Sequence, residues 1–444
     1  MKKIKLIFFF LLITCSVFSQ HLKRRASFGA VLININDSIA RVNKLTNNQG
    51  CCIKQIIAEG SAEKMKFQVG DVILQINNQT IQNRLQLISL FAKMKDGDAI
   101  KINIVRNGKQ KTINGKLLGV KYDTYSFADV IYSEVAFDKG YLRNIFIKPK
   151  GSGKFPTVFF IQGYTCSSID NMGEIHPYEK ALIGLVQRGY AVCKIEKPGM
   201  GDCDGTPACK DIDFATELKA FEVAYNQLGS NVFIDTSKIF IFGHSMGGMI
   251  APLMKTKIKP KGIAVYGTVT RSWFEYFVEQ MRVQNFIVGE DYATNDSAFN
   301  SRLQLCYDLM INKKTPQQLK QNPEFATQWG FEEPNYIFGR NYLYWQQLQD
   351  YSLIVAWKNY DGKVLSIWGE CDFVAFSRYD HELISEIINK YHLGNGTFVA
   401  IPNSDHAFTH VSNMKHAAEM WGNYEYSKNN FNSKIVDVLV DWMK

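Results

Sequence analysis

Short apolar runs alternate with amphipathic segments from about residue 122 to the end of the chain. A strand buried on both faces of a parallel sheet is apolar throughout, whereas a crossover helix repeats its apolar residues every three to four positions. The alternation therefore predicts an α/β fold, with a mostly parallel sheet and helices on both faces. Strands are expected at 157–162, 191–196, 239–243, 263–267, 363–369 and 397–401, after antiparallel leader strands at 129–137 and 142–149, with helices at 177–188, 214–228 and 433–443.

The alternation stops between residues 270 and 362, where the patterns are helical. This stretch lies between two expected core strands, and long insertions in compact domains tend to be functional lids. We therefore expect a helical cap over about 270–362. Its aromatic residues line an apolar or sugar-stacking pocket or else form the core of the cap: Trp273, Phe274, Tyr276, Phe277, Tyr336, Tyr342, Tyr344 and Trp345.

The segment before residue 121 has a different pattern. Short runs of β-forming residues are separated by Gly and Asn turns, and one amphipathic stretch predicts a helix. We expect a small β-rich domain over 21–120, followed by the α/β domain over 121–444. The β-type runs are 30–35, 52–58, 71–76 and 99–105, and the helical stretch is 85–94.

The β-rich domain resembles a bacterial-type PDZ domain. The resemblance rests on residues 56–81, IIAEGSAEKMKFQVGDVILQINNQTI, and on residues 96–113, DGDAIKINIVRNGKQKTI, which fit the last two strands. It implies that the loop formed by Phe28, Gly29 and Ala30 binds the carboxylate of a peptide C-terminus while the peptide extends the edge of the sheet. The alternative is a module that only packs against the second domain.

The start of the chain has the features of an export signal. Three lysines within the first five residues precede an apolar run at 6–13, and small residues follow up to Ser19. We expect a signal peptide over 1–19 and a periplasmic or extracellular protein, with lipoprotein anchoring at Cys15 as the alternative. The apolar run is short for a membrane span, and no other long apolar stretch is present, so no transmembrane segment is expected.

Charge and cysteine content limit the partners. The formal net charge is +9, and the excess is spread along the chain, whereas nucleic-acid binding needs a clustered basic stripe. The chain has no Cys-x-x-Cys pair, so neither a structural zinc site nor any other metal site is expected. Cysteine connectivity cannot be deduced from sequence, and free buried thiols are an alternative. The pairs weighed for a disulfide are Cys203 with Cys209, which are close in sequence, and Cys166 with Cys371, which lie on loops at strand ends.

The most informative motif is Gly243-His244-Ser245-Met246-Gly247. It follows an apolar strand pattern and precedes a helix-compatible segment. Gly-x-Ser-x-Gly at such a strand-to-helix turn is the nucleophile elbow, whose sharp turn leaves no room for side chains two residues either side of the serine. The elbow places the serine beside helix N-terminal amides, which favour a developing negative charge. The motif therefore predicts Ser245 as a nucleophile.

A serine nucleophile needs a base, and the base needs an orienting carboxylate. In this arrangement the chain order is serine, acid, histidine, and the last two lie in loops at the carboxyl ends of strands. Asp372 and His406 fit these positions, with Glu370 and Asp405 as rivals for the acid. The other histidines have structural interpretations: His244 is expected to pack under the elbow, and His21, His176, His381, His392, His410 and His416 lie in no motif.

Two backbone amides are needed to bind the oxyanion. One is expected at Met246, the residue after the nucleophile. The other is expected at Tyr164, in the loop that follows the first central strand. The α/β-hydrolase family, which this part of the chain resembles, usually has His-Gly at this turn, where this chain has Gln162-Gly163. The amide can still act because the side chain is not the donor.

Residues from about 137 to 444 resemble the α/β-hydrolase family, close to its esterase and serine-aminopeptidase-like members. The segment EKPGMGDCDG at 196–205 is similar to the loop that these enzymes carry after their next central strand. The resemblance implies a secreted serine hydrolase that cleaves a carboxylic ester through an acyl-enzyme intermediate, with no cofactor. Two alternatives remain: a peptidase that uses the same triad on amides, and a non-catalytic protein whose PDZ-like module binds peptides. The sequence does not define the particular substrate or the oligomeric state.

Overall fold

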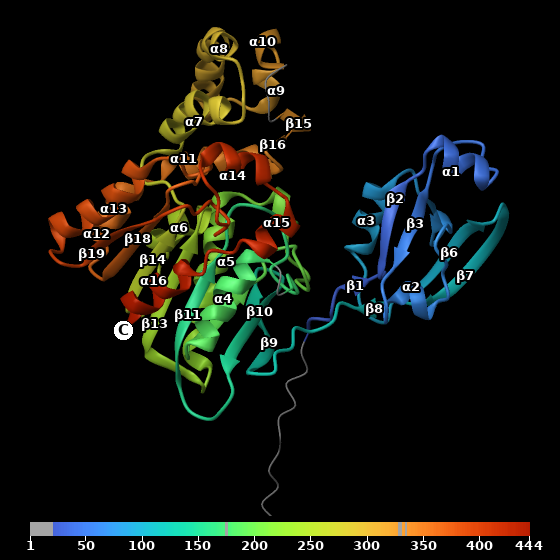
Figure 1. Cartoon of the computed structure of the whole chain (residues 1–444), viewed down its shortest axis with the longest axis horizontal. Helices are drawn as coiled ribbons and strands as arrows, with labels where there is room; N and C mark the ends of the chain where they lie inside the picture. Colours follow the sequence, from blue (N-terminus) through green and yellow to red (C-terminus); the bar gives the residue numbers. More distant parts are fainter. Residues whose placement is uncertain (1–20, 174–175, 327–330, 334) are drawn as a thin grey trace, which may run out of the picture.

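The computed structural model describes residues 21–173, 176–326, 331–333 and 335–444. Figure 1 shows two bodies, a small β-rich one formed early in the chain (blue) and a larger α/β one (green to red). The predicted signal peptide, with Cys15, lies outside the described residues. Within those residues, no helix combines the length and the apolar character that crossing a membrane requires.

The small body is an antiparallel sheet with the strand order β2-β3-β4-β6-β7, and β5 pairs with β4. Alternate residues of β6, namely Ile100, Ile102 and Ile104, are buried, as expected for a strand with one face on a core. The strands β1 and β8 pair at the base of this body, where the chain enters and leaves it. The bounds are β1 Ala26–Ser27, β2 Ala30–Asn34, α1 Asp37–Val42, β3 Cys51–Ile56, α2 Ser61–Lys64, β4 Val72–Ile76, β5 Gln79–Thr80, α3 Arg84–Phe91, β6 Ala99–Arg106, β7 Lys109–Lys116 and β8 Leu118–Gly119.

The large body is built on an eight-stranded mixed sheet with the order β19-β18-β14-β13-β11-β12-β10-β9. The strands β9 and β10 pair antiparallel, as do β10 and β12, and every pair from β12 to β19 is parallel. The expected strand runs match the observed strands to within a few residues. The bounds are β9 Ala128–Phe137, β10 Gly140–Pro149, β11 Phe155–Ile161, β12 Ala191–Ile195, β13 Ile234–His244, β14 Gly262–Tyr266, β18 Lys363–Gly369 and β19 Gly396–Ile401.

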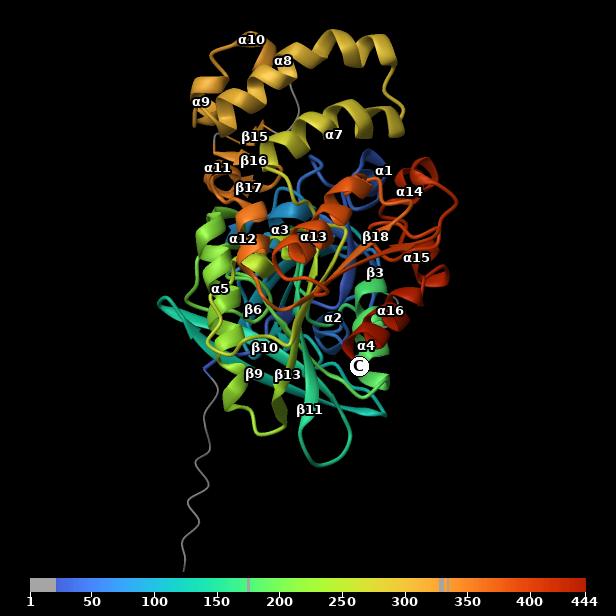
Figure 2. The ribbon, with the colours of Figure 1, turned by 90° about the vertical axis from the view of Figure 1, so that its left-hand side faces the viewer.

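Helices cover both faces of this sheet, and the pleat of the strands separates two cores. In β11, Val158 and Phe160 pack into the core beneath α4 and α16, whereas Phe159 and Ile161 pack into the core beneath α5, α6, α12 and α13. Figure 2 shows α5 on one side of the sheet and α4 with α16 on the other. The bounds are α4 Pro177–Gln187, α5 Phe214–Asn226, α6 Met246–Ile250, α12 Leu353–Asn359, α13 Arg378–Tyr391 and α16 Lys434–Met443.

Most of the chain between β14 and β18, from α7 to α11, forms a layer beyond the carboxyl ends of the strands, as Figure 1 shows at the top. Most of it is helical, as expected for a cap, but it also contains a three-stranded sheet, β15-β16-β17, which was not expected. These strands are two or three residues long, too short to give a periodic pattern. The bounds are α7 Trp273–Ile287, α8 Tyr292–Met310, α9 Pro316–Leu319, α10 Pro323–Ala326, β15 Phe331–Glu333, β16 Tyr336–Ile337, β17 Arg340–Asn341 and α11 Tyr342–Asp350.

Two short helices, α14 (Met414–Met420) and α15 (Tyr424–Asn429), follow β19 near the same end of the sheet. Within the described ranges, the remaining regular structure is three 3₁₀ turns: η1 Cys209–Asp211, η2 Leu228–Ser230 and η3 Ala251–Leu253.

A buried arginine joins the two bodies. Nη1 of Arg24 lies 2.5 Å from Oδ2 of Asp170 and 2.6 Å from Oδ2 of Asp202, and all three side chains are almost fully buried. The same guanidinium donates to the carbonyls of Val120 and Lys121, just beyond the small body. The side chain of Arg24 therefore holds the chain segments at both ends of the small body against the large body.

Candidate active site

Ser245 lies between β13 and α6 in a strained backbone conformation. Its φ is 56° and its ψ is −123°, a region that non-glycine residues rarely adopt. The backbone amide of Ser245 donates to the carbonyl of Tyr266 at 2.9 Å, and its carbonyl accepts from the amide of Gly248 at 2.8 Å. The turn therefore holds the serine at the carboxyl end of the sheet, which is the geometry of a nucleophile elbow.

The glycines of the motif are required by close backbone contacts. A Cβ atom at Gly243 would lie 2.4 Å from the carbonyl oxygen of Gly247, and one at Gly247 would lie 2.0 Å from the carbonyl oxygen of Ile161. Both distances are far below van der Waals contact, and both obstacles are backbone atoms that cannot rotate away. The elbow therefore tolerates only glycine at these positions.

Asp372 and His406 are brought together from the loops after β18 and β19. Nδ1 of His406 lies 2.8 Å from Oδ2 of Asp372, and both side chains are buried. The other carboxylate oxygen, Oδ1, accepts from the amides of Val374 at 2.9 Å and Ala375 at 2.7 Å. Burial acts to raise the pKa of Asp372, but the charge of His406 and these hydrogen bonds outweigh it, so the pKa is lowered and the carboxylate stays ionised.

The rival acids do not take this position. Glu370 is exposed, and the carboxylate of Asp405 accepts from the amides of Ala407 and Thr409, not from the ring of His406. Burial raises the pKa of Asp405 to about 6. The geometry thus favours Asp372 as the carboxylate that orients His406.

Ser245 and His406 line the same cavity, which has a volume of about 950 Å³. Among the described residues, their side chains share no hydrogen bond, and a Cβ atom placed at Gly163 would lie 3.5 Å from Oγ of Ser245. Nucleophile–base hydrogen bonds are often long in unliganded enzymes and shorten when substrate binds. The structure therefore places the serine and the imidazole at one cavity, with the imidazole already held by its carboxylate.

His244 is a structural neighbour of the base. Its Nε2 lies 2.8 Å from the carbonyl oxygen of His406, and its ring packs against Tyr178 and Phe408. Burial lowers the pKa of His244 to about 3, so the ring is neutral at ordinary pH. It packs beneath the elbow, where the sequence placed it.

The residues predicted to supply the oxyanion-binding amides are Met246, which directly follows Ser245, and Tyr164, which follows Gly163 in the loop after β11. Met246 is the first residue of α6, a position whose N–H has no acceptor within the helix. A Cβ atom at Gly163 would lie 3.5 Å from Oγ of Ser245, so the peptide between Gly163 and Tyr164 passes next to the nucleophile. Tyr164 itself lines the cavity.

A disulfide joins Cys166 to Cys209. Both pairs weighed from the sequence are wrong, since Cys203 and Cys371 are free, buried thiols. The bond connects the loop after β11, which carries Tyr164, to η1 in the loop after β12. The partners are 43 residues apart, so only the fold brings them together.

The cap aromatics divide between the two expected roles. Trp273, Tyr276, Phe277 and Trp345 line the cavity, whereas Tyr344 is fully buried and its hydroxyl donates to Glu217 at 3.1 Å. The cap therefore supplies an aromatic wall above Ser245 and also has an aromatic core of its own.

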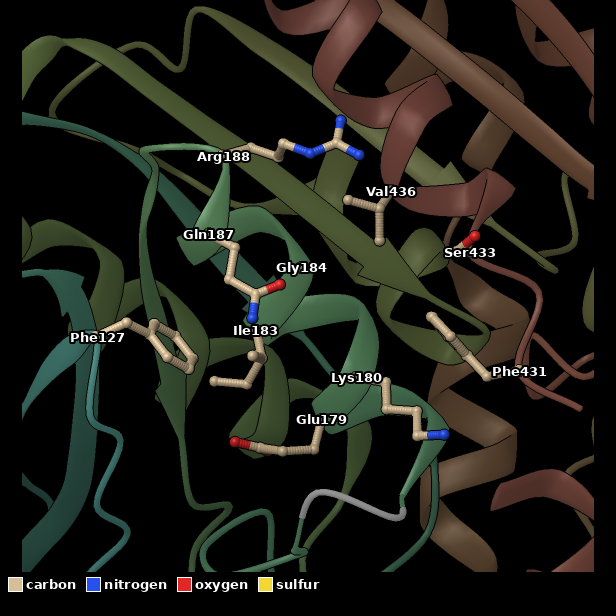
Figure 3. A pocket seen from close by; sticks show the side chains of 10 residues that line it. All are labelled: Phe127, Glu179, Lys180, Ile183, Gly184, Gln187, Arg188, Phe431, Ser433 and Val436. Atoms are coloured by element: carbon tan, nitrogen blue, oxygen red, sulfur yellow. The ribbon is translucent and has the colours of Figure 1, made fainter. Parts of the chain in front are cut away.

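Other features of the large body lie away from Ser245. Figure 3 shows a second hollow of about 450 Å³ between α4 and the segment leading into α16, lined by residues that include Phe127, Lys180 and Val436. No residue of the Ser245 cavity contributes to it. Across the described ranges, no group of three or more His, Cys, Asp or Glu side chains could hold a metal ion.

The loop of Phe28, Gly29 and Ala30 leads into β2, an edge strand of the small body. The carbonyl of Phe28 accepts from Ala62, and that of Gly29 accepts from Ile57, which fixes the loop. In the part of the chain that the structure describes, no acceptor is recorded for the amides of Phe28 and Gly29. Gly29 has a φ of 73°, and a Cβ there would lie 2.7 Å from Cα of Gly60, so this position also requires glycine.

Comparisons with known proteins agree with this description. Residues 28–117 match the family model of the PDZ domain. Curated relatives named probable periplasmic serine endoprotease DegP-like include one from Pseudomonas putida, 36% identical over 90 residues, and one from Marinomonas sp., 29% identical over 90 residues. Each match covers 20% of this chain and 19% of the relative, so the chain spans about a fifth of the relatives' length.

Solved structures similar to the chain include the esterase Est1E from Butyrivibrio proteoclasticus with ferulic acid bound, with a TM-score of 0.44, 16% identity, and coverage of 69% of this chain and 98% of Est1E. An acylaminoacyl peptidase from Pyrococcus horikoshii has a TM-score of 0.41 and 13% identity, covering 78% of this chain and 47% of the peptidase. The chain thus contains a PDZ domain, followed by an α/β domain built on the eight-stranded mixed sheet. The PDZ resemblance noted in the sequence is confirmed.

Proposed function

We propose that the protein is a serine hydrolase that cleaves a carboxylic ester through Ser245, His406 and Asp372. The observation that carries the proposal is the buried 2.8 Å contact between His406 and Asp372 at the cavity that Ser245 lines. A carboxylate held ionised beside one imidazole nitrogen fixes the tautomer and leaves the other nitrogen free to act as a base. We assign the PDZ-like domain to 21–120, the hydrolase domain to 121–444 and the cap to about 270–362.

The proposed reaction proceeds in two halves. Oγ of Ser245 attacks the ester carbonyl while Nε2 of His406 takes the hydroxyl proton, and the carbonyl oxygen becomes an oxyanion that the amides of Tyr164 and Met246 bind. The tetrahedral intermediate collapses, the alcohol leaves with the proton from His406, and Ser245 remains acylated. Water then attacks the acyl-enzyme and loses a proton to His406, which returns that proton to Oγ of Ser245 as the second tetrahedral intermediate collapses and releases the acid. Asp372 stabilises the imidazolium in both halves.

A peptidase acting on amides is the second candidate, and the PDZ domain favours it because the curated relatives that share this module are named serine endoproteases. The same triad can attack an amide carbonyl, with the amine as leaving group. The two candidates differ in the substrate that the cavity accepts. A non-catalytic, peptide-binding protein would need none of the triad geometry.

The PDZ domain is proposed to bind the C-terminus of a peptide. The amides of Phe28 and Gly29 are available to a carboxylate, and the edge strand β2 can accept a further antiparallel strand. A fluorescent peptide with a free C-terminus should bind, and the same peptide with an amidated C-terminus should bind at least about 10-fold more weakly. Equal binding of both would contradict the assignment of this loop.

Export to the periplasm or outside the cell is proposed from the N-terminal pattern. The Cys166–Cys209 disulfide supports it, because disulfides persist in oxidising compartments. The test is to express the full chain with a C-terminal tag in a bacterium and to sequence the N-terminus of the tagged protein in the periplasmic fraction. The expected mature start is Gln20.

The hydrolase proposal is tested with a fluorophosphonate probe and two substrate panels. The wild-type protein should be labelled and Ser245→Ala should not. Activity on p-nitrophenyl esters above that on aminoacyl p-nitroanilides supports an esterase, and the reverse order supports a peptidase. Absence of labelling in a folded wild-type protein would contradict both and favour the binding protein.

A further inference from the structure

The backbone beside the nucleophile is held by a buried cluster of charges that the sequence did not indicate. Nζ of Lys197 donates to the carbonyl of Gly163 at 2.5 Å and lies 2.9 Å from Oε1 of Glu217. Nη2 of Arg340 lies 2.5 Å from Oε2 of Glu217, and its Nη1 donates to the carbonyl of Tyr164 at 2.8 Å. Lys197 and Glu217 are fully buried, and Arg340 is 1% exposed.

The members of the cluster come from three separate parts of the fold. Lys197 follows β12, Glu217 lies on α5, and Arg340 lies on β17 in the cap. Nζ of Lys197 has two recorded partners, one carboxylate and one carbonyl, and the carbonyl belongs to the loop beside Ser245. A buried lysine is unfavourable unless it is paired, so its position is tightly specified.

The contact between Lys197 and the Gly163 carbonyl fixes the orientation of the peptide unit between Gly163 and Tyr164. The C=O of Gly163 and the N–H of Tyr164 belong to one planar peptide unit, and in a trans peptide they point in opposite directions. No cis peptide bond is present among the described residues. Lys197 therefore pulls the carbonyl to one side and turns the amide of Tyr164 to the other. A Cβ atom at Gly163 would lie 3.5 Å from Oγ of Ser245, so this peptide unit passes next to the nucleophile.

We infer that Lys197 is a positioning residue that aims the Tyr164 amide at the oxyanion through the carbonyl of Gly163, and that Glu217 and Arg340 hold Lys197 and the loop in that position. The inference rests on the proposed function, because the oxyanion forms only if Ser245 attacks a carbonyl. Preorganised donors stabilise the transition state more than the bound substrate. Loss of Lys197 should therefore lower kcat and leave KM nearly unchanged.

The cluster contains one more cation than anion, and each charge is paired. Burial lowers the pKa of Lys197 to about 8, and the charge of Glu217 opposes that shift. Burial acts to raise the pKa of Glu217, but the charges of Lys197 and Arg340 outweigh it and the pKa is lowered. At neutral pH the cluster holds two cations around one carboxylate, which leaves a cation available to hold the two backbone carbonyls.

A lysine three positions earlier, on β12, provides a matched control. Lys194 is also fully buried and is also paired with a buried glutamate, Glu179, at 2.7 Å. It lies on the opposite face of the sheet, beside α4, and its charged partners among the described residues are Glu179 and Asp123, not the loop of Gly163. Lys194→Met and Lys197→Met therefore remove the same kind of buried ion pair, but only the second affects the Tyr164 amide.

The experiment compares wild type, Lys197→Met and Lys194→Met on a p-nitrophenyl ester, with thermal unfolding as the measure of folding. We expect Lys197→Met to lower kcat by about 10- to 100-fold with KM within about 2-fold, since complete loss of an oxyanion donor lowers kcat by about 10²–10³. Inhibition by an arylboronic acid, which forms a tetrahedral adduct with the serine, should weaken by a similar factor. Lys194→Met should lower the unfolding temperature comparably and leave kcat within about 2-fold.

A folded Lys197→Met with wild-type kcat, or equal losses of kcat in both variants, would overturn the inference. If Lys197→Met does not fold, the comparison is repeated with Lys197→Gln and Lys194→Gln, where the same difference in kcat must appear. Inactive wild-type protein that also fails to react with a fluorophosphonate would instead contradict the proposed function. The two failures are therefore distinguishable.

Discussion

The proposed role of Asp372 is to orient the imidazole of His406, and substitution of Asp372 tests that role directly. In Asp372→Asn the amide cannot stabilise an imidazolium and favours the wrong tautomer of His406, so kcat should fall by about 10³–10⁴-fold. The unfolding temperature should change little, because the replacement has the same shape. A rate within 10-fold of wild type would show that another carboxylate orients the base.

Asp405→Asn is the matched control, and it also tests a pH effect. The activity of this variant should stay within about 5-fold of wild type. Burial raises the pKa of Asp405 to about 6 in the folded protein, above its ordinary value of 3.8. The protonated form is thus favoured by folding, so stability is greatest below pH 3.8 and falls as the pH rises through 6.

Replacing Asp405 by asparagine should remove that fall, which amounts to about 2 to 3 kcal/mol. The measurement is the free energy of unfolding in urea at pH 4 and pH 7, for wild type and variant. The difference between the two proteins should be larger at pH 7, with the variant relatively more stable. An identical pH dependence in both proteins would contradict the effect.

Among elements, the disulfide between the loop after β11 and η1 should stabilise the fold beside the nucleophile. Removing a disulfide that closes a loop of this length destabilises a protein by about 2–4 kcal/mol. Cys166→Ser combined with Cys209→Ser should lose that amount in urea unfolding. A reductant should weaken wild type to the same extent and leave the double variant unchanged; an equal response of both would contradict the bond.

Elements with a strong local pattern were predictable, and those that depend on distant contacts were not. The strand that ends at His244 and the elbow at Ser245 follow from apolar runs and glycines whose spacing has a steric cause. The partner of Cys166 and the role of Arg340 follow only from the fold, because the groups they contact lie 43 or more positions away in sequence.

At the scale of the whole molecule, Arg24 couples the stability of the hydrolase domain to the PDZ domain. The side chains of Asp170 and Asp202 are fully buried, and the guanidinium of Arg24 compensates the negative charge of both carboxylates. Arg143 also lies 3.1 Å from Asp202. Breaking one side of such a buried pair is destabilising by about 3–5 kcal/mol. We expect Arg24→Met to lower the unfolding temperature of the hydrolase domain, measured by loss of ester hydrolysis on heating.

The matched control is Arg106→Met, which breaks the ion pair of Arg106 with Asp71 inside the PDZ domain. This variant should weaken the PDZ domain and leave the heat inactivation of ester hydrolysis unchanged. If both variants shift heat inactivation equally, the coupling does not depend on Arg24.

The adjacent entry and exit of the PDZ domain have a consequence for its motion. The first described residues lie on the α/β domain, where the backbone amide of Leu22 donates to Glu134, and the chain then enters the PDZ domain at β1. It returns through β8, the partner of β1, so the PDZ domain is attached by two neighbouring chain segments. Two attachments limit its rotation relative to the α/β domain more than a single linker would. We therefore expect a peptide bound to the PDZ domain to occupy a narrow range of positions relative to Ser245.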